Sequence, residues 1–498
     1  MKPYKTLLFI LSVFSIMGAA WFLFPEKGID IGLATLRFPT YAEARTVEPA
    51  AVDIDSVLNT VDESNETNLS GGLIDSLEFF KTYITSNPNR IALPNDDYTY
   101  FDTLFAALEN ARRDSVTCRI MHYGDSQIEL DRISSVLRQT LQEMFGGSGP
   151  NMIPAVQRIP SISVVQRASG GLAQYNVYGD STTSRIASRR YGVMTQMSQS
   201  TGESTISFNV TSHSHSFEKV KEITHVAMLV GHNGDGFKAT LRCDNALVGS
   251  QTLKADNGLH LLQWPLAKAA KRGTITIQGD AEIYAVMLDG DHGVAVDNVP
   301  LRGCSGTIFT RIEEKLMNES FKMLNTKLII LQFGGNRMPS ISSVNNIPKY
   351  MDEMERQIAY FRRVAPDATL LFIGPADMGR SYDGKIKTWK NLPALNDSLK
   401  DLALRNKVAY WDMFHVMGGE GSMALWVRHD PPLAGPDYIH FTHTGAQKMG
   451  TALTNSLITY YNFFVLRKEI PADEVYDFIN KEAEPDSTAN TRIYNKYF

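Results

Sequence analysis

Two hydrophobic patterns alternate along the chain, and this alternation limits the folds it can adopt. Before about residue 150 and after about residue 294, short apolar runs alternate with stretches that have apolar residues at helical spacing; the runs include VTCRIMHYG (116–124), KLIILQFGG (327–335) and KVAYWDMF (407–414). Strands that alternate with helices form a parallel sheet with both faces covered. These two parts of the sequence therefore predict one α/β layer domain, over residues 73–149 and 294–465.

Between residues 150 and 293 the helical spacing disappears. Short alternating runs replace it, separated by Gly, Asn and Asp; examples are STISFNV (204–210), THVAMLVGH (224–232) and GTITIQG (273–279). Short strands at this spacing are typical of a β-sandwich. We therefore expect an inserted β-sandwich that interrupts the α/β domain.

The N-terminus has the features of an export signal. Lys2 and Lys5 precede an uncharged apolar run over residues 6–24, which is nearly long enough for a helix to cross a bilayer. Residues 1–25 are either a membrane anchor or a cleaved signal peptide. Basic residues before the run predict an exported body. That body would face the periplasm from the inner membrane, or be periplasmic or secreted if the segment is cleaved.

Composition narrows the possible partners. Residues 26–72 are polar and acidic and resemble a flexible linker, and residues 466–498 form a charged tail. The net charge of −5 and the lack of a basic cluster argue against nucleic acid as a partner. Only three cysteines occur, so no disulfide framework is expected, and we interpret them as buried thiols; they are Cys118, Cys243 and Cys304.

The first apolar run ends in Gly-Asp-Ser, and a helical pattern begins at once. Ser126 is either a helix N-cap, a common position for serine, or a nucleophile at the carboxyl edge of a parallel sheet, where such sheets bind ligands. A helix that starts at this corner would present N–H groups to an oxyanion beside Ser126. The three residues alone do not decide between these interpretations.

Three further blocks follow in order, each at an expected strand end or loop: RGCSG (302–306), FGGNRM (333–338) and GPDYIHFTHTG (435–445). Together with the Gly-Asp-Ser corner they resemble the ordered blocks of the SGNH, or GDSL-type, hydrolase family. The resemblance covers roughly residues 95–145 and 294–464. It implies a three-layer α/β/α fold and a serine hydrolase.

The resemblance assigns roles to individual residues. Ser126 would be the nucleophile, His440 its base and Asp437 the carboxylate that orients the imidazole, as in a Ser–His–Asp triad. The oxyanion would be bound by the backbone N–H groups of Ser126 and Gly306 and by the side-chain amide of Asn336. No cofactor and no metal are implied.

Other interpretations of these residues remain open. Asn336 could cap a helix, Gly306 could be a turn glycine, and Asp125 is expected to shape the corner. His443 and His429 are rival bases, and we rank both below His440. Three more residues have no predicted role: Arg337, which we interpret as solvated, and the pair His213 and His215, for which we identify no third zinc ligand.

The position of the insertion resembles peptidoglycan O-acetylesterases of the SGNH family, which carry a carbohydrate-binding module there. Tyr175, Tyr178 and Trp264 either stack on sugar rings or belong to the core. We therefore predict an exported esterase that removes O-acetyl groups from a cell-envelope glycan, with peptidoglycan favoured. The alternatives are a glycan O-acetyltransferase with the same triad, a lipase or thioesterase, and a non-catalytic glycan-binding protein.

Overall fold

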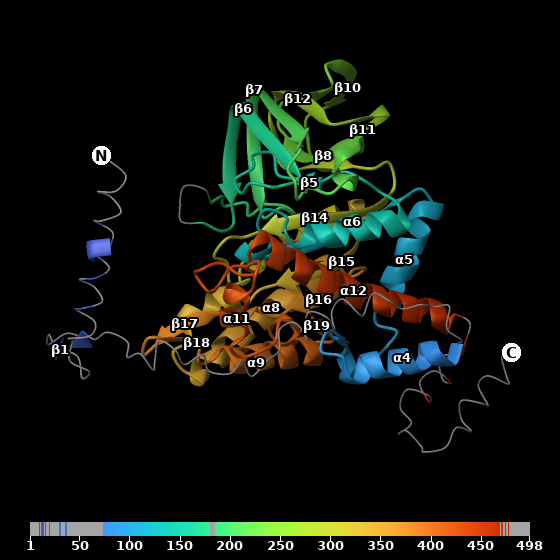
Figure 1. Ribbon diagram of the computed structural model, residues 1–498. Coiled ribbons are helices and arrows are strands. Elements are labelled where there is room, and N and C mark those ends of the chain that lie inside the picture. The colour runs from blue at the N-terminus through green and yellow to red at the C-terminus, as the bar shows by residue number, and fades with distance from the viewer. Residues whose placement is uncertain are drawn as a thin grey trace. The chain divides into compact units, whose positions relative to one another are not determined.

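The computed structural model describes residues 73–179 and 185–468 continuously, with scattered positions before residue 37 and after residue 469. The predicted anchor, linker and tail lie largely outside the described residues. Within the described part of the chain, no helix is long and apolar enough to cross a membrane. The described residues between 73 and 468, apart from 381–386, belong to one compact unit, which contains both the α/β domain and the inserted strands (Figure 1).

A six-stranded sheet forms the centre of the α/β domain. Its strand order is β14-β4-β15-β16-β19-β3, in which the first five strands are parallel and β3 pairs antiparallel at the edge. The strands are β14 (Gly293–Pro300), β4 (Thr117–Gly124), β15 (Thr326–Gln332), β16 (Thr369–Ile373), β19 (Ala409–Trp411) and β3 (Ile91–Ala92).

Helices cover both faces of this sheet, which gives three layers. Successive side chains of a strand point to opposite faces, and β15 shows this: Leu328 and Ile330 enter one core cluster, and Ile329 and Leu331 enter the other. The first cluster includes residues of α4 (Leu73–Ser86), α5 (Asp102–Arg113), α6 (Ser134–Phe145), α10 (Met413–Val416), α11 (Ser422–Arg428) and α12 (His443–Arg467). The second includes residues of α7 (Glu314–Met323), α8 (Ile347–Val364) and α9 (Leu392–Arg405). The predicted three-layer α/β/α fold is confirmed.

Outside the α/β domain just described and the inserted strands described next, the described elements are short. They are β1 (Ile29–Asp30), β2 (Thr35–Leu36), β17 (Gly379–Tyr382), β18 (Lys385–Thr388) and single 3-10 turns, among them η2 (Ser126–Ile128), η5 (Phe309–Arg311) and η6 (Gly335–Ser340).

The inserted region is a nine-stranded antiparallel sheet. Its strands are β5 (Asn151–Ile153), β6 (Val164–Asn176), β7 (Gln196–Val210), β8 (Ile223–Asn233), β9 (Phe237–Cys243), β10 (Ala246–Leu253), β11 (Asp256–Ala270), β12 (Arg272–Gly279) and β13 (Ala281–Asp289). Hydrogen bonds join all nine strands into one sheet, so the two halves of the predicted β-sandwich are linked to each other. The reason is the length of β7, because residues 203–209 pair with β12 while residues 198–200 pair with β13. Both halves of this sheet nevertheless contribute to one apolar core.

The insertion packs firmly against the α/β domain through β13. All nine residues of β13 are buried. Ile283 and Val286 face the core of the inserted sheet, whereas Tyr284 and Met287 join the cluster of the α/β domain. Because β13 contributes to both cores, it fixes the insertion to the α/β domain.

A buried ionic cluster spans the same junction. Arg119 on β4 donates to both carboxylate oxygens of Asp297 on β14, at 2.7 and 2.9 Å, and to Asp289 at the end of β13. Burial raises the pKa of Asp297 above its usual value, although Arg119 opposes that effect. Arg119 therefore compensates two carboxylates that have little access to water.

We expect Arg119→Met to lower the free energy of unfolding by about 3–5 kcal/mol, because it leaves buried carboxylates without their cation. Since the ionised form of Asp297 is the costly one, the loss should be larger at pH 8 than at pH 5. Chemical denaturation at the two pH values measures it. Arg113→Met is the matched control, because its partner Asp114 is exposed and such pairs contribute little. Equal stability of both variants would contradict the prediction.

Candidate active site

Ser126 lies directly beyond the carboxyl end of β4, as predicted, but it does not begin a long helix. It opens the 3-10 turn η2, and the Asp125 side chain caps that turn by accepting a hydrogen bond from the Gln127 N–H at 3.0 Å. Helix α6 begins only at Ser134, because Leu130 and Asp131 have positive φ angles of 60° and 64°. The prediction of a helix that starts at the corner, with its dipole beside Ser126, is therefore wrong.

The structure brings Ser126, His440 and Asp437 together in one hydrogen-bonded line. Ser126 Oγ lies 2.8 Å from His440 Nε2, and His440 Nδ1 lies 2.7 Å from Asp437 Oδ2. The other carboxylate oxygen, Oδ1, accepts the backbone N–H groups of Ile439 and His440 at 3.0 and 3.1 Å. With the Nδ1 proton directed at Asp437, the Nε2 lone pair faces the serine hydroxyl, which is the arrangement that a general base requires.

Asp437 is held in its ionised form. Partial burial favours the neutral acid, but the hydrogen bonds from the His440 ring and from the two backbone N–H groups outweigh burial and lower the pKa of Asp437. The carboxylate therefore stays negative at neutral pH and can stabilise an imidazolium on His440.

The three predicted oxyanion donors are placed differently from one another. The Ser126 N–H makes no hydrogen bond to another described residue, so it is available to an acyl oxygen. The Asn336 amide lines the same cavity as Ser126, and its Nδ2 donates to Asp125 Oδ2 at 3.1 Å and to the Cys304 carbonyl at 3.3 Å. The Gly306 N–H donates instead to Cys304 Sγ at 3.3 Å, and Gly306 is not among the residues that line the cavity. Its predicted oxyanion role stays a prediction.

Asp125 contacts Asn336 as well as the turn that Ser126 opens. Its carboxylate joins the capped turn of Ser126 to the Asn336 amide, and burial raises the pKa of Asp125 to about 6. Above that pH the folded protein holds a buried negative charge at a cost, whereas the unfolded chain ionises near 3.8 without that cost. The charge thus lowers stability as the pH rises through about 6.

We expect Asp125→Asn to raise the melting temperature near pH 8 and to lower kcat by about tenfold, because it removes the buried charge and one acceptor that orients the Asn336 amide. The gain in melting temperature should disappear below about pH 4, where the carboxyl of the parent protein is neutral in both states. Thermal melts from pH 4 to 8, together with kcat on a short acyl ester, measure both effects. An unchanged kcat would show that Asn336 keeps its orientation without Asp125.

Two further side chains that the sequence did not single out connect the serine and histidine segments. Gln127 Nε2 donates to the Ile439 carbonyl at 2.7 Å, and the Arg132 guanidinium donates to the carbonyls of Phe441 at 2.7 Å and Ser126 at 3.0 Å. Both residues follow Ser126 closely in the chain, but only the folded geometry shows that their partners flank His440.

The rival bases lie in other surroundings. The His443 ring stacks against His215 at 3.6 Å between centroids, and burial, with the nearby His215 and Arg132, lowers the pKa of His443 to about 4. His429 Nδ1 lies 2.7 Å from the Pro431 carbonyl. Neither residue contacts Ser126.

The other open interpretations can also be placed. Arg337 pairs with Glu353 at 3.4 Å and lies over the Tyr350 ring, away from the triad. Asn336 makes no side-chain helix cap. His213 and His215 lie 5.4 Å apart between ring centroids, and the described residues contain no group of three or more potential ligands that could hold a metal ion.

A small cavity opens beside the triad. Its volume is about 140 Å³, and most of its wall is apolar, with Phe333, Pro375, Met378, Trp389, Met413 and Ile439 around Ser126, Asn336 and His440. Pockets for drug-sized ligands are typically about 300–1,000 Å³. The cavity therefore suits a short acyl group next to the serine better than a long chain.

Comparison with known proteins agrees with this geometry. Residues 273–448 match the model of the GDSL-like Lipase/Acylhydrolase family; this range contains Asn336, Asp437 and His440 and begins after Ser126. A search of curated proteins found no match.

Solved structures give the fold. A peptidoglycan O-acetylesterase matches with a TM-score of 0.59 and 17% sequence identity, over 72% of this chain and 96% of that chain. A family two carbohydrate esterase from Clostridium thermocellum matches with a TM-score of 0.25 and 11% identity, over 59% of this chain and 100% of that one. Residues 273–448 thus match a GDSL-like lipase/acylhydrolase domain, the chain shares its fold with a solved esterase, and Ser126, His440 and Asp437 have the hydrogen-bonded geometry of a serine hydrolase's triad.

Proposed function

We propose that this protein is an exported esterase that removes O-acetyl groups from a cell-envelope glycan, with peptidoglycan as the favoured substrate. The observation that carries the proposal is the hydrogen-bonded line of Ser126, His440 and Asp437 beside a cavity of about 140 Å³. The likeness in fold to a peptidoglycan O-acetylesterase supports the choice of glycan. The basic residues and apolar run at the N-terminus support export.

The proposed reaction has two steps. In the first, Ser126 Oγ attacks the acetyl carbonyl carbon and its proton passes to His440 Nε2; the resulting oxyanion accepts hydrogen bonds from the Ser126 N–H and the Asn336 amide. The tetrahedral species then expels the sugar oxygen, which takes the proton from His440, and an acetyl ester remains on Ser126. In the second step, His440 takes a proton from water as its oxygen attacks the acetyl carbon; the tetrahedral species then breaks its bond to Ser126 Oγ, which takes the proton back from His440, and acetic acid leaves as acetate.

Acetate release from O-acetylated peptidoglycan and from O-acetyl xylan tests the proposal, with the full chain and its Ser126→Ala variant. Short and long p-nitrophenyl esters measure the acyl preference. We expect acetate from peptidoglycan with the parent protein, none with Ser126→Ala, and poor cleavage of the long ester because the cavity is small. The transferase alternative predicts transfer of acetyl to an added acceptor sugar in place of release.

Cleavage of long esters in preference to short ones would favour a lipase or thioesterase. Failure of the folded protein to cleave any ester would overturn the proposal and favour a glycan-binding protein.

A further inference from the structure

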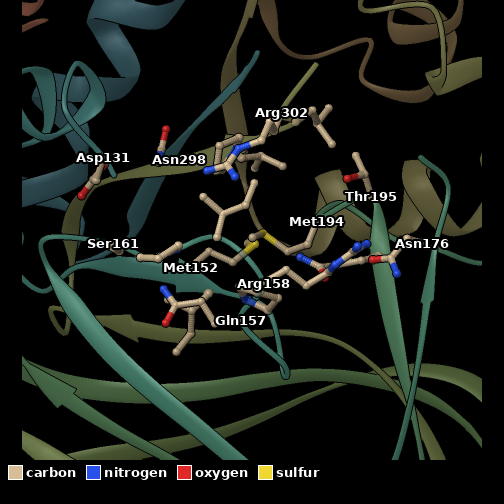
Figure 2. A pocket seen from close by; sticks show the side chains of 18 of the residues that line it. Asp131, Met152, Gln157, Arg158, Ser161, Asn176, Met194, Thr195, Asn298 and Arg302 are labelled. Carbon is tan, nitrogen blue, oxygen red and sulfur yellow. The ribbon is translucent and has the colours of Figure 1, made fainter. Parts of the chain in front are cut away.

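A second and larger cavity lies between the inserted sheet and the α/β domain. Its volume is about 520 Å³, within the usual range for ligand pockets. One wall is the end of β14 and the loop after it, through Gly303; the opposite wall comes from β5, β6 and the start of β7 (Figure 2). Because β14 pairs with β4 in parallel, this cavity lies at the same sheet edge as Ser126, one strand away.

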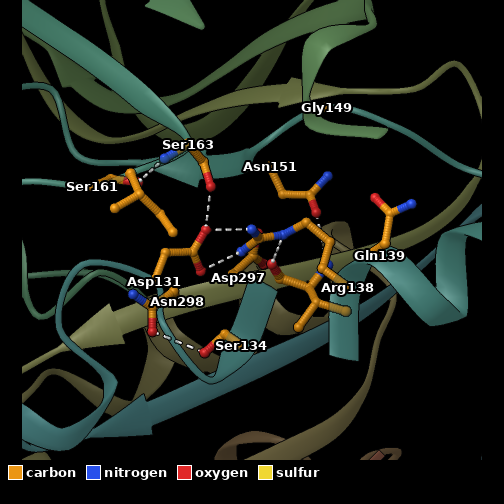
Figure 3. Close-up of polar contacts among 12 residues, drawn as sticks. Asp131, Ser134, Arg138, Gln139, Gly149, Asn151, Ser161, Ser163, Asp297 and Asn298 are labelled. Carbon is orange, nitrogen blue, oxygen red and sulfur yellow. Dashed lines mark hydrogen bonds and ion pairs between the residues drawn. The ribbon is translucent and has the colours of Figure 1, made fainter. Parts of the chain in front are cut away.

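The floor of the cavity is rigid. Arg138 donates to both carboxylate oxygens of Asp131 and to the Val296 carbonyl, and Ser163 donates to Asp131 at 2.6 Å (Figure 3). This network joins α6, the segment after Ser126 and the inserted sheet. Its charges are satisfied within the network, so its contribution is to hold the cavity open rather than to supply free groups.

Two other polar side chains line the space of the cavity. Asn176 and Thr195 are 7% and 4% exposed, yet their side chains make no hydrogen bond to another described residue. Buried polar groups are normally paired, so each is available to a ligand. Thr195 also has a positive φ of 57°, which is rare for a β-branched residue. This wall therefore holds two polar side chains on buried residues, one of which, Thr195, also has a strained backbone.

Charge favours an anion. Three arginines line the cavity; Arg138 is paired with Asp131 and Arg302 with Glu129, so the positive charge offered to a ligand comes from Arg158. Arg302 forms a two-pronged ion pair with Glu129, with both distances 2.6 Å. Arg158 makes no ion pair with any other described residue, and its guanidinium lies beside Gly179, which has no side chain to cover it. Arginine recognises planar carboxylates through paired hydrogen bonds.

The remaining surface suits a sugar or a short aliphatic segment. Met152, Met194 and Val164 give apolar contacts. Tyr178 also lines the cavity, and its hydroxyl donates to the Gly303 carbonyl at 2.7 Å. Of the three aromatic residues considered for stacking, Trp264 is instead buried in the core of the inserted sheet and Tyr175 packs against the core of the α/β domain.

We propose that this cavity binds a carboxylate-bearing part of the glycan whose acetyl group is removed at Ser126, with Arg158, Asn176 and Thr195 as its hydrogen-bond donors; the assignment rests on the proposed function. The carboxylate belongs either to an acidic sugar or to a short peptide attached to it. Binding there would discriminate against neutral acetylated glycans.

Calorimetric titration of the full-length Ser126→Ala protein tests this inference without turnover. The probes are N-acetylglucosaminyl-N-acetylmuramic acid, the same disaccharide with a dipeptide, and neutral chitobiose. We expect at least one carboxylated probe to bind tenfold or more tighter than chitobiose, and the tighter of the two identifies the carboxylate's source. Introducing Arg158→Gln into the Ser126→Ala protein should weaken the binding of that probe by about tenfold. The control is Arg272→Gln, because Arg272 lies on the same sheet in an exposed ion pair with Asp244. It should leave the affinity for that probe unchanged.

Equal affinity for all three probes, no measurable binding, or no effect of Arg158→Gln would each overturn the inference. These outcomes are separate from acetate release. A carboxylated probe that binds through Arg158 while the parent protein releases no acetate would count against the esterase and leave the binding site standing. Acetate release by the parent protein without selective binding of a carboxylated probe would support the esterase and count against the binding site.

Discussion

Replacing His440 with alanine is expected to lower kcat for a short acyl ester by about 10⁴- to 10⁶-fold, with little change in the melting temperature. His440 is the only described histidine within hydrogen-bond distance of Ser126 Oγ, at 2.8 Å. Without it, the serine hydroxyl has no base to remove its proton at neutral pH. Because the imidazole is 40% exposed, its loss leaves no large cavity in the core. Steady-state kinetics on p-nitrophenyl acetate measure the effect.

The double variant Ser126→Ala/His440→Ala sharpens this prediction. Residues that act as one unit are strongly non-additive, so the double variant should be no slower than either single variant. His429→Gln and His443→Gln serve as matched controls for the rival bases, and each should keep kcat within about twofold. If His443→Gln were as damaging as His440→Ala, the assignment of the base would be wrong.

The sequence contained enough information for the layers of the fold. Apolar runs such as KLIILQ are buried on both faces only in a covered parallel sheet, and the structure places them there. The break between Ser126 and α6 was not predictable, because apolar residues keep helical spacing through Leu130 and Asp131, and positive φ angles leave no mark on that spacing. The pairing of β7 with two partners was not predictable for a similar reason, since one long strand with two partners has the same alternating pattern as two strands.

For the site, the spacing of Asp437 and His440 was sufficient to place both on one turn, and the ordered blocks placed Ser126 and Asn336 near them. What the sequence could not supply were contacts between distant segments. Gln127 and Arg132 donate hydrogen bonds to backbone carbonyls of the residues on either side of His440. Because every residue has a backbone carbonyl, no residue type in the sequence marks these contacts. The cavity lined by Arg158 likewise depends on how the insertion packs against β14, and no local pattern encodes that packing.

Removal of the Asn336 amide is the second large effect that we expect. Asn336→Ala should lower kcat by about 10²- to 10³-fold and change KM little, because the amide stabilises negative charge that exists only in the transition state. The Asn336 side chain lines the cavity with Ser126, and its donors are oriented by Asp125 and the Cys304 carbonyl. One of those two hydrogen bonds must lengthen or be shared when the oxyanion forms.

The choice of variants separates this role from a structural one. Asn336→Asp keeps the size of the side chain but replaces the donor with a carboxylate beside Asp125, so it should be at least as slow as Asn336→Ala. Asn345→Ala, an exposed asparagine in the following turn, should retain full kcat. If Asn336→Ala raised KM and left kcat intact, the amide would bind the substrate's ground state instead. The oxyanion would then depend on the Ser126 N–H and on a rotation of the Gly306 N–H away from Cys304 Sγ. Gly306→Ala would test that rotation, since a Cβ at Gly306 would lie 2.7 Å from the Phe333 ring and hinder it.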